Sequence, residues 1–201
     1  MKHELNRSLS DTSNHVLAYL YGLWENRTSR MYLLLAIGCL FALLILKLNK
    51  PLFFIVLFLI LNILIALILK PFRTILFGIE LVMFATVLTG MAYGVKAGLF
   101  MGLFASALKI IFQDGFTIIG IFVVPSYTLM GLIAPFLASA NVTHVGILLT
   151  VIHAVLVSVI IFIMLGGEVS RIAIYLITYI PYNFFLFAYI APTVFKVMTQ
   201  G

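Results

Sequence analysis

The chain has 201 residues, of which 64% are hydrophobic and 9% are charged, and its formal net charge is +6. A soluble domain averages about 45–50% apolar and about 25% charged residues, so this composition excludes a soluble globular domain and indicates an all-α, polytopic bundle of transmembrane helices. No run of Lys and Arg is long enough to follow a phosphate backbone. We therefore expect membrane lipids as partners and no nucleic acid.

The first 30 residues are polar, and we treat 1–30 as a domain separate from the apolar remainder, 31–201. Ser10 to Thr12 are good helix caps, and the residues that follow place apolar side chains on one face of a short helix that includes Trp24. We expect this amphipathic helix either to lie on the membrane surface, with Trp24 at the headgroup level, or to dock on the rest of the protein.

Seven apolar segments follow the polar domain. They lie at about 31–47, 52–69, 75–93, 96–113, 117–138, 143–166 and 172–195. A helix that crosses the hydrocarbon core needs about 20 residues at about 1.5 Å each. The sequence therefore predicts seven spans, or six if one segment is re-entrant or peripheral.

The basic residues divide eight to four between the two sides of the membrane when the N-terminus is placed in the cytoplasm. The cytoplasmic side then holds Lys2, Arg7, Arg27, Arg30, Lys70, Arg73, Lys109 and Arg171. The other side holds Lys47, Lys50, Lys96 and Lys196. Because cytoplasmic loops are enriched in Lys and Arg, we expect a multi-pass protein of the cell membrane with a cytoplasmic N-terminus and, for seven spans, an external C-terminus.

Four glycines stand four residues apart in the stretch "GMAYGVKAGLFMGLFAS", at Gly90, Gly94, Gly98 and Gly102. They lie within one apolar block, 74–113, which as a single helix would be about 60 Å long, twice the hydrocarbon thickness. The chain must turn near the middle of this block, and Gly94, between a tyrosine and a nearby lysine, is the best place. Gly98 and Gly102, continued by Ser106, then form a small-residue stripe for helix packing or for a partner helix.

This predicted hairpin places Glu80 level with Lys109, fourteen residues before and after the turn. Charged side chains within spans are costly, and they are usually paired or functional. We therefore expect a Glu80–Lys109 ion pair. It would belong either to a polar site between the two helices or to the cytoplasmic interface, where Arg73 could be a second partner of Glu80.

The remaining polar residues of the spans are candidates for binding a solute. Pro181 frees a backbone carbonyl and is expected to kink the last span, exposing polar groups to a cavity or to a neighbouring helix. Tyrosine rings can stack on a flat ligand, while an asparagine can form hydrogen bonds with the donors and acceptors of that ligand. The alternative is that these side chains only hold helices together. The candidate substrate-binding residues are Tyr127, His153, Tyr179, Tyr182 and Asn183.

The sequence offers no metal site, cofactor motif or catalytic motif. His144 and His153 are nine residues apart, so on one helix they point in opposite directions, and Cys39 is the single cysteine. Neither a Walker motif nor the HExxH or Gly-x-Ser-x-Gly signature is present. We therefore expect a protein that is not an enzyme, has no catalytic residues and does not hydrolyse ATP itself.

The segment "YGVKAGLFMGLFASALKIIFQDG" resembles the substrate-binding S-components of energy-coupling-factor vitamin transporters. That family joins two central helices by a glycine turn followed by Gly-x-x-x-Gly, and its last helix has a Pro and an Asn near its start, as do Pro181 and Asn183. Two positions depart from the pattern: Val95 replaces the usual proline after the turn, and the Ala-x-x-x-Ala motif of the first helix is reduced to Gly38-x-x-x-Ala42.

This resemblance implies a micronutrient-binding uptake subunit that is energised by separate membrane and ATPase subunits. The same glycine-rich hairpin is similar to that of MreD-like cell-shape scaffold proteins, which bind partners rather than solutes. Two functions therefore stay open, solute uptake and a structural or assembly role in a larger membrane complex. A solute binder should have a closed polar pocket near one face, lined by Tyr127, His153, Tyr179 and Asn183. A scaffold should lack such a pocket and expose the small-residue stripe to a partner helix.

Overall fold

A computed structural model describes residues 49–200 of the chain, except for 73–77, 115–117 and 165–168. Within these ranges the chain forms helices and short turns and contains no β-strand, which confirms the all-α class. Four expectations lie outside the described residues. They concern the amphipathic helix with Trp24, the span 31–47, the Gly38/Ala42 motif and the contact from Arg73.

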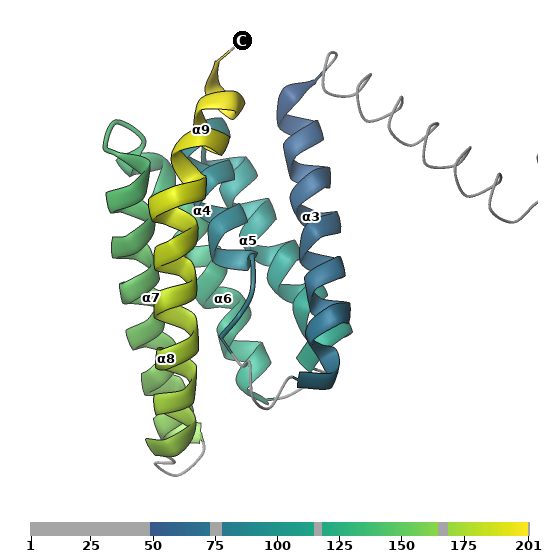
Figure 1. Cartoon of the computed structure of the whole chain (residues 1–201), viewed down its shortest axis with the longest axis vertical. Coiled ribbons are helices and arrows are strands. Elements are labelled where there is room, and N and C mark those ends of the chain that lie inside the picture. Colours follow the sequence, from purple (N-terminus) through teal and green to yellow (C-terminus); the bar gives the residue numbers. More distant parts are fainter. Residues whose placement is uncertain (1–48, 73–77, 115–117, 165–168, 201) are drawn as a thin grey trace, which may run out of the picture. The chain divides into compact units, whose positions relative to one another are not determined.

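The described helices run in chain order from α3 to α9. The main helices are α3 (Lys50–Leu69), α4 (Val82–Tyr93), α5 (Val95–Lys109), α6 (Ile118–Ile133), α7 (Val142–Met164), α8 (Val169–Phe185) and α9 (Ala191–Thr199). Short 3₁₀ or π turns extend four of them, at Lys70–Phe72, Ile110–Asp114, Ala134–Leu137 and Leu186–Ile190. Figure 1 shows α3 and the α7/α8 pair on opposite sides of α4, α5 and α6.

Five of the described helical stretches are long and apolar enough to cross a membrane. They are Lys50–Leu69, Val95–Gln113, Gly120–Leu137, Val142–Met164 and Val169–Thr199. Each carries large apolar side chains that no other part of the described chain covers, as expected where lipid is the solvent. These helices indicate a polytopic α-helical membrane protein.

Helix α3 illustrates how the sequence separates a lipid face from a bundle face. Residues four apart lie on one side of a helix, so two interleaved series define two faces. The exposed series is Leu52, Val56, Ile60 and Leu64. The buried series is Phe54, Phe58, Asn62 and Ala66. Phe58 packs edge-on against Phe84 of α4, with 6.0 Å between the ring centroids.

The predicted span 75–93 differs from the expectation, because in its described part, residues 78–93, only Val82–Tyr93 is helical. Twelve residues extend about 18 Å, less than the hydrocarbon thickness of about 30 Å. The non-helical segment 78–81 runs inside the bundle to the first residue of α4 (Figure 1). The Gly78 N–H donates to Thr178 Oγ1 of α8 at 3.1 Å, which attaches this segment to α8.

Helix α4 is the core helix of the described bundle, since all ten residues from Val82 to Met91 are buried. An unbroken apolar run is expected both for a lipid-facing span and for a helix that is surrounded by protein. The sequence therefore identified a helix here, but it did not distinguish these two environments.

The predicted turn between α4 and α5 is present at Gly94. Its backbone has φ 87° and ψ −175°, and the Gly94 N–H donates to the Gly90 carbonyl at 2.9 Å. These angles lie in a region that essentially only glycine occupies. The sequence located the turn correctly because glycine was the one residue type that this conformation allows.

We expect Gly94→Ala to lower the free energy of unfolding by about 1–3 kcal/mol, the usual cost of such a backbone conformation in a residue with a side chain. A Cβ at this position would meet no atom within 4 Å, so the effect would come from the backbone alone. Thermal unfolding in detergent measures it, with Lys96→Ala, in the first turn of α5, as the control. Equal stability of the two variants would contradict this account of the turn.

The glycine stripe packs inside the chain, against α6. A Cβ on Gly98 would collide with the carbonyl oxygen of Gly131, and a Cβ on Gly102 would lie 2.7 Å from the carbonyl oxygen of Tyr127. Ser106, the third member, is also buried and donates to the Gly102 carbonyl. The stripe thus serves helix packing within the described bundle, where backbones of α5 and α6 approach closely.

Pro181 does not open an internal site, contrary to the expectation. Helix α8 continues through it, and Pro181 is exposed on the outside of the bundle. The carbonyl that loses its N–H partner belongs to Ile177, whose side chain is 73% exposed. A π turn, Leu186–Ile190, follows α8 and leads into α9.

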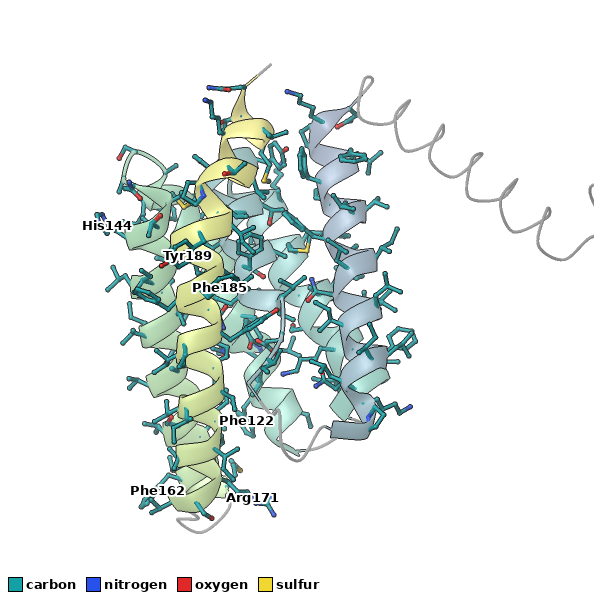
Figure 2. All side chains as sticks on the ribbon, in the orientation of Figure 1. Phe122, His144, Phe162, Arg171, Phe185 and Tyr189 are labelled. Carbon is teal, nitrogen blue, oxygen red and sulfur yellow. The ribbon has the colours of Figure 1, made fainter. Side chains whose placement is uncertain are left out.

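The start of α3 and the end of α9 lie at the same end of the bundle, because Lys50 Nζ donates to the carbonyl of Gln200. Figure 2 shows His144 near this end and Arg171 at the opposite end of the α7/α8 pair. This arrangement agrees with the predicted division of basic residues, which puts Lys50 and Lys196 on one side and Arg171 on the other.

Candidate functional site

The ion pair expected from the hairpin is present. Lys109 Nζ, at the last residue of α5, contacts Glu80 Oε2, just before α4. Only 11% of the lysine side chain and 3% of the glutamate side chain are exposed. The pair is therefore enclosed by protein, and burial of two charges is tolerated because each is close to its counter-ion.

A group of stacked rings from three helices forms the second part of the site. His153 of α7 stacks on Tyr127 of α6, with 4.0 Å between centroids, and its ring centroid is 5.5 Å from that of Tyr179 on α8. Tyr175, one turn before Tyr179, stacks on it at 4.9 Å. All four side chains are buried. The structure thus brings together three of the five candidate binding residues.

The ion pair and the rings belong to one cluster. His153 lies within electrostatic reach of the Lys109 ammonium group, and the Glu80 carboxylate acts on Tyr175 and Tyr179. We call the whole set the polar cluster; its members lie just before α4 and on α5, α6, α7 and α8. It consists of Glu80, Lys109, Ser126, Tyr127, His153, Tyr175, Tyr179 and Asn183.

A hydrogen bond to Ser126 fixes the orientation of the His153 ring. The Ser126 hydroxyl donates to the carbonyl of Val123 at 2.7 Å, so its oxygen is free to accept from His153 Nδ1, 3.2 Å away. The other ring nitrogen, Nε2, is buried and has no hydrogen-bond partner among the described residues. Such an atom costs about 1–3 kcal/mol when it stays unsatisfied.

Asn183 shows the same pattern on α8, one turn beyond Tyr179. Its Nδ2 donates to the Tyr179 carbonyl at 3.0 Å, while its Oδ1 is buried and finds no hydrogen-bond partner in the part of the chain that the structure describes. Asn183 and His153 are each 0% exposed. Two fully buried residues of the cluster therefore retain hydrogen-bonding capacity that the described protein atoms do not use.

Tyr182, the remaining candidate, is placed differently. It is half-buried and lies at one edge of the face of α8 that carries Tyr175, Tyr179 and Asn183. The residues of that face recur every four positions, a spacing that puts them on one side of a helix. This periodicity was the signal that could have identified Tyr175; Ser126 had no comparable signal, because its role depends on a residue of α7.

The histidines do not form a pair. His144 is exposed near one end of α7 (Figure 2), whereas His153 is fully buried, as their nine-residue separation predicts. Among the residues that the structure describes, no group of three or more His, Cys, Asp or Glu side chains is arranged to hold a metal ion. The chemistry that the cluster offers is hydrogen bonding, ring stacking and one paired charge of each sign.

We compared the chain with known protein families, curated proteins and solved structures. No protein-family model, no curated protein and no solved structure matches the chain. The fold and the site together therefore define a class, a polytopic α-helical membrane protein with a buried polar cluster in its helical bundle.

Proposed function

We propose that the chain is a non-enzymatic membrane subunit that binds a small organic solute for uptake, similar to an S-component. In this proposal it resides in the cell membrane with six or seven spans, a cytoplasmic N-terminus and an external C-terminus. Other membrane subunits supply the energy, since the sequence has no nucleotide-binding motif.

The observation that carries this proposal is the unused hydrogen-bonding capacity of His153 Nε2 and Asn183 Oδ1 inside the polar cluster. Buried polar atoms are nearly always satisfied in native proteins, so an unsatisfied pair in one cluster is expected where a ligand or bound water completes the site. Convergence of polar side chains from several helices near a buried ion pair is also typical of substrate pathways in membrane proteins.

The packing of the glycine stripe favours solute binding over the scaffold alternative. A scaffold was expected to present Gly98 and Gly102 to a helix of another chain, but α6 occupies this face. A partner helix on the same face would have to displace α6. The scaffold function therefore has no specific support from these residues.

We expect the small-molecule fraction of a rich growth medium to raise the melting temperature of the full-length protein in lipid nanodiscs, because a ligand that binds only the folded state stabilises it. Asn183→Ala should reduce this rise, since it removes one of the two buried acceptors, His153 Nε2 and Asn183 Oδ1. Asn62→Ala is the matched control: Asn62 is also buried and also donates to the carbonyl four residues earlier, at 2.8 Å, but it lies on α3. Absence of any rise, or a rise that Asn183→Ala retains undiminished, would contradict the proposed function.

A further inference from the structure

Two buried atoms of the polar cluster, His153 Nε2 and Asn183 Oδ1, are hydrogen-bond acceptors without a partner among the described residues, whereas the buried hydroxyls of Tyr175 and Tyr179 interact with each other. Burial against two tyrosine rings and a hydroxyl favours the neutral imidazole for His153. The Ser126 hydrogen is committed to Val123, so the hydrogen bond with His153 requires the imidazole proton on Nδ1. Nε2 then carries a lone pair and no hydrogen, which makes it an acceptor.

The orientation of the Asn183 amide is fixed in the same way. Its nitrogen lies 3.0 Å from the Tyr179 carbonyl oxygen. The flipped amide would place two oxygens against each other, with no hydrogen between them, and is therefore excluded. The atom that remains without a partner in the described chain is Oδ1, a second acceptor.

The charges of the cluster do not change the preference for a ligand that donates hydrogen bonds. The carboxylate of Glu80 already contacts the Lys109 ammonium, so the pair contributes no net positive charge that would attract an anion. A ligand carboxylate or phosphate would place acceptor oxygens opposite the acceptors of His153 and Asn183. The tyrosine rings, in contrast, favour planar groups and cations on their faces.

From this inventory we propose that the solute is a small planar molecule that donates N–H or O–H hydrogen bonds to His153 Nε2 and Asn183 Oδ1 and carries no negative charge. The inference rests on the proposed function, because it names the substrate class of the same site. Amidine-like and amino-substituted ring compounds fit this class, whereas aromatic carboxylates do not.

The test compares two probes of nearly the same shape, benzamidine and benzoate, by calorimetric titration of the full-length protein in nanodiscs. We expect benzamidine to bind at least about tenfold more tightly, and Asn183→Leu to weaken it by about tenfold, the effect of one lost hydrogen bond. Asn62→Leu removes an equivalent buried asparagine from α3 and should leave benzamidine binding unchanged. His153→Phe should also weaken benzamidine binding by about tenfold. Its control is His144→Phe, at an exposed position of α7, which should leave benzamidine binding unchanged.

The outcomes separate this inference from the proposed function. Benzoate binding as tightly as benzamidine, with dependence on Asn183, would overturn the substrate class and leave a small-molecule site in place. Failure of both probes to bind would also overturn the substrate class. The response to the growth-medium fraction would then decide whether the site binds any solute. Benzamidine binding that survives both Asn183→Leu and His153→Phe would show that the two acceptors are not the contacts.

Discussion

The variant Gly98→Leu should fail to assemble the α5/α6 pair, and we expect little or no folded protein to be recovered. A Cβ alone would collide with the backbone oxygen of Gly131 and lie 2.9 Å from the Gly90 Cα. These contacts are with backbone atoms, which cannot rotate away as a side-chain end can. The cost should therefore reach or exceed the upper end of overpacking effects, about 3 kcal/mol.

Size-exclusion chromatography of a fluorescent fusion, followed by thermal unfolding of the recovered fraction, measures this loss. Lys96→Leu is the control, because it introduces the same side chain at an exposed position of the same helix. Recovery of Gly98→Leu at the level of this control would mean that α5 and α6 do not approach each other at Gly98 as described.

The second large effect is expected from breaking the buried ion pair. Removal of one partner, in Glu80→Gln or Lys109→Met, leaves the other charge enclosed with its counter-ion missing, and this costs about 3–5 kcal/mol. The double variant removes both charges and should recover much of the loss. A double-mutant cycle on the free energy of unfolding measures this coupling directly.

Lys70→Met is the matched control for the lysine substitution, since Lys70 is exposed at the end of α3. It should change the free energy of unfolding by no more than about 0.5 kcal/mol. Additive losses in the double variant, or single variants as stable as the control, would show that the contact between Glu80 and Lys109 does not stabilise the fold.

The parts of the fold that follow from local rules could be predicted from the sequence. Composition identified the helical membrane class, and the length limit on a single span required a turn, which glycine located at Gly94. The register of that hairpin then gave the pairing of Glu80 with Lys109, because equal numbers of residues from a turn bring two antiparallel helices level.

The parts that depend on tertiary packing were not predictable in the same way. The apolar run 75–93 does not reveal that its helix is short and enclosed by other helices. The sequence also suggested two separate sites, an ion pair and an aromatic group, because nothing in it places Lys109 within electrostatic reach of His153. The four-residue periodicity of α8 carries Tyr175 into the cluster, on the face that the bundle buries.

Native mass spectrometry of the gently extracted full-length protein, incubated with the growth-medium fraction, tests the central claim most directly. We predict one small organic molecule bound per chain, at unchanged occupancy in Asn62→Ala and at reduced occupancy in Asn183→Ala. A chain that stays bare, or one that carries only another protein subunit, would contradict the claim that the polar cluster is a solute-binding site.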